Sequence, residues 1–99
     1  MRKTAILLAS TDNCATCTEN VSTRDRIFLA DQPDYDLIAA EDIPMWHKIA
    51  LTDINKGEYV RKYGEVIGEA LEDIEKGSLI NHENIQSVKR DYSAEYIEE

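Results

Sequence analysis

The feature of this sequence that most limits its fold is an eight-residue repeat. "DINKGEYV" (residues 53–60) and "DIEKGSLI" (residues 73–80) share the pattern D-I-x-K-G-x-x-[VI] and begin twenty residues apart. A shorter echo, "EDIP", begins at Glu41. Such a repeat indicates one structural unit that is used more than once within a single small domain.

Each copy of the repeat predicts a tight turn between a buried residue and a new strand. Ile54 and Ile74 are expected to point into the core, and Gly57 and Gly77 are free to take the positive φ that a turn needs. The aspartate that opens each copy is well placed to accept hydrogen bonds from turn amides. We favour this role over ligand binding because aspartate is a common turn former.

Short apolar runs separated by turn formers continue along the chain and predict a mainly β fold. Residues 68–77, "GEALEDIEKG", also place apolar residues at helical spacing, so a helical turn is the alternative there. We expect one domain over residues 1–87, followed at residues 88–99 by an acidic tail or one short amphipathic helix.

The composition fits a small domain that relies on a partner. A chain of 99 residues builds only a modest core. Its net charge of −9, from 20 acidic and 11 basic residues, argues against binding to nucleic acid phosphates. The first apolar run is shorter than a signal peptide requires, and no segment has the length of a membrane span. We therefore expect a cytoplasmic protein.

The two cysteines, Cys14 and Cys17, form a C-x-x-C motif, whose spacing is compatible with metal binding, redox chemistry or packing. A metal site needs more ligands than one such pair supplies. A thioredoxin-like motif needs a helix after a strand, and the segment "CTENVST" is a poor helix former. We therefore favour packing, in which the thiols act as small apolar groups.

Several segments together form a family pattern: "TDNCATC" (residues 11–17), "HKIALTDINKGE" (47–58), "KYGEVIG" (62–68) and "DIEKG" (73–77). This pattern resembles the N-terminal SAF-type, β-clip domain of the altronate and galactarate dehydratase family. It is also similar to the small subunits of the related sulfolactate sulfo-lyases. The resemblance implies a small SAF-like β-clip domain with short turns. It also implies a packing role for Cys14, since the family has a small aliphatic residue there.

In that family the SAF domain is joined to, or associates with, a much larger domain that holds most of the substrate and metal ligands. The resemblance therefore implies a small subunit of a sugar-acid dehydratase, a hydro-lyase that is inactive without a large subunit. Any divalent metal, Fe²⁺ or Mn²⁺, would be held mainly by that large subunit. Unpaired strand edges offer a route to a homo-oligomer in its absence. The alternative is a non-catalytic SAF-type module for carbohydrate binding or assembly, because a fold does not determine a function.

His47 and Lys48 are the candidate catalytic residues. Dehydration of a sugar acid needs a base for the proton next to the carboxylate, a clamp on the acid and an acid for the leaving hydroxyl. His47 is suited to move that proton or to ligate a metal, and Lys48 to hold the carboxylate. Both can serve one site only if the chain turns there, as Pro44 indicates. Without the resemblance, a loop histidine bonded to backbone is the simpler interpretation of His47.

Four further residues are candidate substrate contacts: Asp12, Asn13, Tyr63 and Glu65. Asp12 and Asn13 stand where the family has its D-N pair, although such a pair is also a common turn former. Tyr63 and Glu65 could offer a phenol and a carboxylate to the site. Alternatively, Tyr63 covers the core and Glu65 faces solvent.

Two departures from the family pattern lie near these candidates. The family has glycine immediately before the histidine, where this chain has Trp46, which reduces backbone freedom and sets a bulky ring beside the site. The segment V-H-x-H-N, which the stand-alone small subunits carry after the second repeat, is replaced by "INHEN" (residues 80–84). His82 falls where neither family histidine stands, so the resemblance gives it no metal role.

Overall fold

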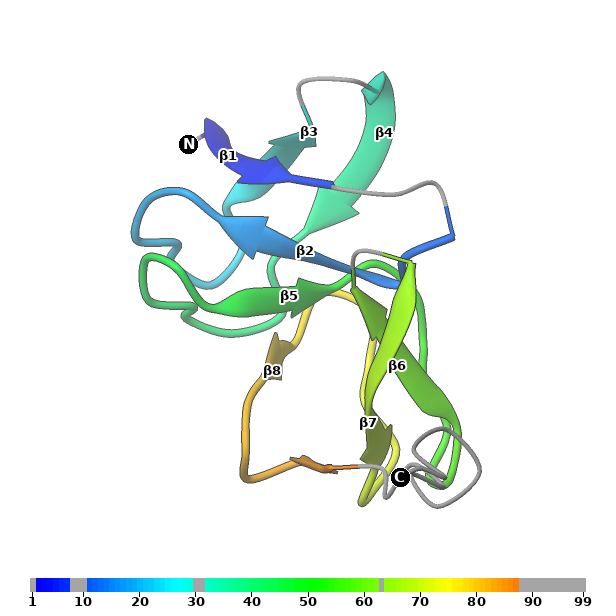
Figure 1. Cartoon of the computed structure of the whole chain (residues 1–99). Coiled ribbons are helices and arrows are strands. Elements are labelled where there is room, and N and C mark those ends of the chain that lie inside the picture. Colours follow the sequence, from blue (N-terminus) through cyan, green and yellow to red (C-terminus); the bar gives the residue numbers. More distant parts are fainter. Residues whose placement is uncertain (1, 8–10, 30–31, 63, 88–99) are drawn as a thin grey trace.

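The computed structural model of the chain describes residues 2–7, 11–29, 32–62 and 64–87 (Figure 1). The regular elements of this part are strands: β1 (Arg2–Ile6), β2 (Cys14–Cys17), β3 (Arg26–Leu29), β4 (Gln32–Ile38), β5 (Lys48–Ala50), β6 (Tyr59–Lys62), β7 (Glu65–Ala70), β8 (Leu79–Ile80) and β9 (Ile85–Gln86). Within these ranges, no helix has the length and apolar character needed to cross a membrane. The predicted mainly β class is confirmed, and the predicted tail or helix at 88–99 lies outside the described residues.

The strands form two sheets. The larger has the order β4-β3-β1-β2-β5-β8 and the smaller has the order β6-β7-β9. Their pairings are antiparallel, except that β1 and β3 run parallel. The β6–β7 hairpin lies below the beginning of β2 in Figure 1, and it is hydrogen-bonded to Asn13, which immediately precedes β2. The two sheets therefore meet where β2 begins.

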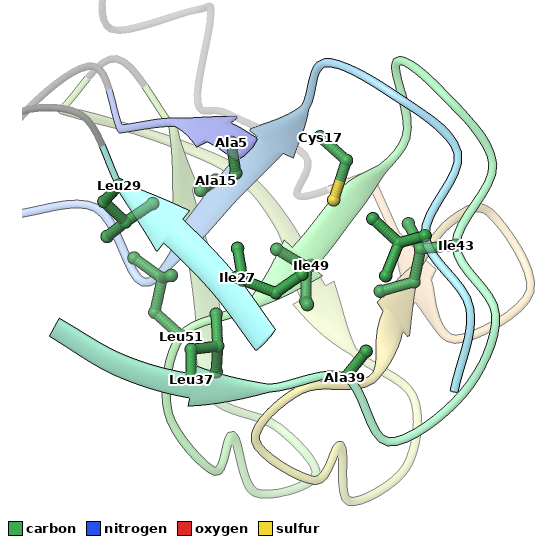
Figure 2. Packing of buried hydrophobic residues seen from close by; sticks show 11 residues of the cluster. Ala5, Ala15, Cys17, Ile27, Leu29, Leu37, Ala39, Ile43, Ile49 and Leu51 are labelled. Carbon is green, nitrogen blue, oxygen red and sulfur yellow. The ribbon is translucent and has the colours of Figure 1, made fainter. Parts of the chain in front are cut away.

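Two hydrophobic clusters fill the domain. The first lies within the larger sheet, where the side chains of Ile27, Leu37 and Ile49 point toward one another (Figure 2). The second lies between the larger sheet and the hairpin: Cys14, Ala50, Ile54, Val60, Ala70, Ile74 and Ile80. Because successive side chains of a strand point to opposite faces, β2 and β5 contribute to both clusters. These two short strands therefore join the two halves of the core.

The repeat has four copies in the structure. Two were predicted, copy C (residues 53–60) and copy D (73–80). Copy B (42–49) contains most of the "EDIP" echo, and copy A (20–27) escaped prediction. The second residue of each copy is buried and forms an isolated bridge, Val21 with Ile43 and Ile54 with Ile74. The predicted core positions of Ile54 and Ile74 are confirmed.

Each copy contains a four-residue turn: turn A (22–25), turn B (44–47), turn C (55–58) and turn D (75–78). In each, the N–H of the fourth residue donates to the carbonyl of the first at 2.9–3.1 Å. The third residue has positive φ, as in a type II turn. Gly57 and Gly77 have φ of 90°, as predicted, whereas Arg24 and Trp46 take values of 77° and 71° without being glycine.

Turns C and D hold each other in place. Asp53 accepts a hydrogen bond from the backbone N–H of Lys76 in turn D, and Asp73 accepts one from the N–H of Lys56 in turn C, each at 2.8 Å. The prediction that both aspartates accept hydrogen bonds from turn amides is confirmed. Each aspartate, however, bonds to the turn of the other copy and not to its own. The exchange ties two segments that are twenty residues apart in sequence.

Turns A and B repeat this exchange with different residues. Asn20 accepts a hydrogen bond from the backbone N–H of Met45 at 2.9 Å, and Asp42 accepts one from the N–H of Thr23 at 2.8 Å. The Thr23 hydroxyl also donates to Asp42, and the two bonds lower the pKa of this carboxyl below its usual value. The chain is therefore built from two pairs of interlocked turns.

The predicted alternative of a helical turn over residues 68–77 is wrong. Strand β7 continues through Ala70, and turn D follows after a bend. The backbone of Ala70 is bonded to turn C, because its N–H donates to Glu58 and its carbonyl accepts from Gly57, each at 2.9 Å. Pairing with turn C outweighs the helical spacing of the apolar residues.

Glycine is required for different reasons in turn C and in turn D. A Cβ atom on Gly57 would meet nothing within 4 Å, so only its φ is unfavourable for other residues. A Cβ atom on Gly77 would lie 2.3 Å from the carbonyl oxygen of Ile38 and 3.1 Å from the nitrogen of Ala40. Turn D is thus packed directly against the chain that leads out of β4.

We expect Gly77→Ala to destabilise the domain much more than Gly57→Ala. The positive φ alone should lower the free energy of unfolding by about 1–2 kcal/mol in both variants. The clash with Ile38 should raise the loss for Gly77→Ala to about 3–5 kcal/mol. Urea denaturation of the two variants measures the difference, and equal losses would contradict the close packing of turn D.

Candidate functional site

His47 is the last residue of turn B, and its side chain is exposed. Its backbone is fixed on both sides, since its N–H donates to Pro44 at 3.1 Å and its carbonyl accepts from the N–H of Cys17 at 2.9 Å. The ring Nδ1 lies 3.3 Å from the carbonyl oxygen of Met45. Because a carbonyl only accepts, this contact favours the tautomer with its proton on Nδ1. Nε2 then faces outward as a proton acceptor.

Lys48 is the first residue of β5 and lies opposite Thr16 of β2 and Ile80 of β8. Residues paired in this way present their side chains on the same face of a sheet. Lys48 is half-buried and forms no ion pair with the described residues. The Thr16 hydroxyl is buried and has no hydrogen-bond partner among them. Lys48 therefore shares a sheet face with Thr16, whose hydroxyl is enclosed by the protein, and an ammonium such as that of Lys48 is a group that binds carboxylates.

Asp12 and Asn13 hold the β6–β7 hairpin. The Asp12 carboxylate accepts a hydrogen bond from the N–H of Gly64 at 2.8 Å. The Asn13 amide accepts from the N–H of Arg61 at 2.7 Å and donates to the carbonyl of Tyr59 at 2.9 Å. The Asn13 amide therefore bonds to one N–H and one carbonyl of β6, as the backbone of a neighbouring strand would. Both side chains have a structural use that the sequence did not predict.

The predicted site residues fall into two groups. Glu65 begins β7 at the same hairpin and is exposed, and Tyr63 lies outside the described residues. The Asn13 carbonyl accepts a hydrogen bond from the N–H of Leu51, four residues after His47. At the rise of an extended chain this separates Asn13 from His47 by about 13 Å. The hairpin group and the His47–Lys48 group therefore lie at opposite ends of β5.

The C-x-x-C pair packs, as predicted. Cys14 lies in the second cluster and Cys17 in the first, and both thiols are free and buried. Burial raises the pKa of each thiol from 9.0 to about 11. The two sulfurs thus lie on opposite faces of β2, where they can neither chelate one ion nor form a disulfide with each other.

The described residues do not form a metal centre by themselves. Among them, no three His, Cys, Asp or Glu side chains are close enough together to hold an ion. His82 lies exposed in the turn between β8 and β9.

The site contains two residues whose roles the sequence did not predict. The unpaired hydroxyl of Thr16 could not be foreseen, although its place two residues after the buried Cys14 indicates the shared face. Trp46 was noted as a departure from glycine, yet its backbone keeps the φ that favours glycine.

We expect the buried thiols to make stability sensitive to alkaline pH. Their pKa is higher in the folded chain than in the unfolded one, so their contribution is complete below pH 9 and is lost as the pH rises to about 11. The loss amounts to about 2–3 kcal/mol per thiol. Urea titrations at about pH 8 and about pH 10.5 measure it. A Cys14→Ala/Cys17→Ala double variant should lack this component, and an identical pH dependence in both proteins would contradict it.

We expect Asn13→Ala to lower the free energy of unfolding by about 1–3 kcal/mol, because two backbone groups of β6 lose their partner. Glu65→Ala, which changes an exposed residue of the same hairpin, should stay within about 0.5 kcal/mol of the parent chain. Thermal denaturation of both variants provides the measurement. An unchanged stability of Asn13→Ala would show that the amide does not hold the hairpin.

Comparison with known proteins places this chain in a family. Residues 3–88 match the family model of the altronate/galactarate dehydratase SAF domain. The chain is 36% identical over 61 residues to the (2R)-sulfolactate sulfo-lyase subunit alpha of Paracoccus pantotrophus, a match that covers 62% of this chain and 91% of that relative. It is 33% identical over 82 residues to the altronate dehydratase of Escherichia coli (strain K12), which covers 83% of this chain but 16% of the longer relative. The predicted resemblance is thereby confirmed: the chain belongs to the SAF-domain family of the altronate and galactarate dehydratases.

Proposed function

We propose that this chain is the small subunit of a sugar-acid dehydratase, whose active site is completed by a large subunit. The observation that carries the proposal is the exposed imidazole of His47, whose Nδ1 contacts the carbonyl of Met45 and whose Nε2 is left as a proton acceptor. The lengths of the relatives support it. One match covers most of a chain that is itself called a subunit, and the other covers 16% of a longer dehydratase.

The chemistry of the two residues suits a hydro-lyase. In this proposal Nε2 of His47 takes the proton from the carbon next to the substrate carboxylate. The electron pair left behind forms a carbon–carbon double bond as the bond to the β-hydroxyl breaks, and the hydroxyl leaves as water after receiving a proton. Lys48, the first residue of β5, holds the carboxylate as negative charge develops there. The large subunit supplies the acid for the leaving group.

The substrate in this proposal is a hydroxylated sugar acid. One relative is called an altronate dehydratase and the other a (2R)-sulfolactate sulfo-lyase, so the leaving group is either hydroxide or sulfite. We propose dehydration first because the family model that covers residues 3–88 is that of the dehydratases. Any Fe²⁺ or Mn²⁺ that the reaction uses is assigned mainly to the large subunit.

The test is co-purification with a large subunit of the dehydratase family from the same organism. The complex and the isolated chain are then assayed on altronate, galactarate and sulfolactate, with added Fe²⁺ or Mn²⁺. The proposal requires turnover by the complex and none by the chain alone. If no complex forms and no acid is turned over, the non-catalytic module for carbohydrate binding or assembly replaces it.

In the active complex, we expect His47→Ala to lower kcat by about 10²–10⁴-fold, because the proton acceptor is removed. His82→Ala is the matched control, since His82 is also an exposed histidine and has no role in the proposal. It should leave kcat unchanged. Full turnover by His47→Ala, with normal association of the subunits, would remove the catalytic role of this residue.

A further inference from the structure

The backbone of Trp46 is held in a conformation that suits glycine. Its φ is 71°, and its N–H donates to the carbonyl of Cys17 at 2.8 Å. The equivalent residue of turn A, Arg24, has φ of 77° and donates to Ala39 at the same distance. Residues other than glycine are disfavoured at such φ. A large apolar residue at this position therefore needs a compensating reason.

That reason is not found in the packing of the described chain. Trp46 is 65% exposed, and Met45 beside it is 40% exposed. Both residues occupy the middle of turn B, which projects from the end of the larger sheet next to turn A (Figure 1). We call Met45 and Trp46 the apolar tip. Trp46 has a positive φ that disfavours residues other than glycine, and both residues of the tip expose apolar surface to solvent. Backbone strain and exposed apolar surface at one place are typical of a surface that binds another molecule.

Polar and charged residues lie in the two loops that meet at the apolar tip. Asn20 is bonded to the N–H of Met45, and the exposed residues Glu41 and Asp42 precede turn B in the chain. Apolar residues at the centre with polar residues around them are the usual composition of a protein–protein contact. Tryptophan is also among the residues that most often dominate the binding energy of such contacts.

We propose that the apolar tip is the anchor by which this chain binds its large subunit, and that Trp46 enters an apolar pocket there. This inference rests on the proposed function. The two relatives indicate which partner covers the apolar tip. In altronate dehydratase the matching segment is part of one longer polypeptide, whereas the sulfo-lyase relative is called a separate subunit. A separate chain must replace the covalent connection by surface contacts. His47 follows the tip directly, so a subunit that covers Trp46 also reaches the imidazole.

Trp46→Gly tests the anchor without damaging the fold. Because glycine suits the observed φ, the Tm of the isolated chain should stay the same or rise by up to about 5 °C. The affinity for the large subunit should fall by about 30-fold or more. Arg24→Gly is the matched control, since it relaxes the same strain on turn A. It should change Tm in the same direction and leave the affinity within about threefold.

A direct readout uses the fact that Trp46 is the only tryptophan of the chain. A chain labelled with 5-fluorotryptophan gives one ¹⁹F signal, which should shift and broaden when the unlabelled large subunit is added. If the large subunit binds while this signal stays unchanged, or Trp46→Gly binds as tightly as the parent, the anchor is overturned and the proposed function stands. If the parent chain does not bind the large subunit at all, both fail. If Trp46→Gly abolishes self-association of this chain instead, the tip is a contact between copies and the proposal is overturned.

Discussion

The reciprocal hydrogen bonds between paired turns are the interactions on which the rest of this structure depends. In each pair, a side-chain oxygen next to the bridging residue of one copy accepts an N–H of the other copy's turn. Below these bonds the bridging residues exchange two backbone bonds of 2.7–2.8 Å. Strands of two to seven residues are too short to be stable alone, and the core of so small a domain is modest. The paired turns fix the strand ends and thereby fix the positions of His47 and Trp46.

Much of this fold was predictable from copies C and D, because their glycines and aspartates are residues typical of turns. The presence of two further copies, A and B, was not predictable. In copies A and B the third turn residue is arginine or tryptophan, so the glycine that signals positive φ is absent although the φ persists. The opening residue of copy A is asparagine, which supplies the same acceptor oxygen as aspartate. All four copies therefore begin with a side chain that accepts a hydrogen bond, followed by a buried aliphatic residue. The residue types themselves differ among the copies.

The candidate site was predicted less well because its residues depend on contacts between distant segments. The packing role of the C-x-x-C pair was predictable because the chain lacks the further ligands of a metal site and the helix of a redox motif; the structure adds that two residues three apart in β2 lie on opposite faces. Sequence reasoning could not foresee that Asp12 and Asn13 bond to a hairpin about fifty residues further along, because nothing in a local turn signal specifies that partner. Nor could it foresee that the Thr16 hydroxyl is left unpaired beside Lys48, which follows from the pairing register of β2 and β5.

The comparison of turns A and B separates what folding requires from what it does not. Both turns need positive φ at the third position, and Arg24 shows that a polar, exposed side chain satisfies this requirement. The apolar character of Met45 and Trp46 therefore lies outside the needs of this fold. Residues that make a site work often lower stability, and here they immediately precede His47. A surface that covers Trp46 would also exclude water from the imidazole and from Lys48 nearby. Charge interactions with a substrate carboxylate strengthen when water is excluded, so binding and chemistry would be coupled through one turn.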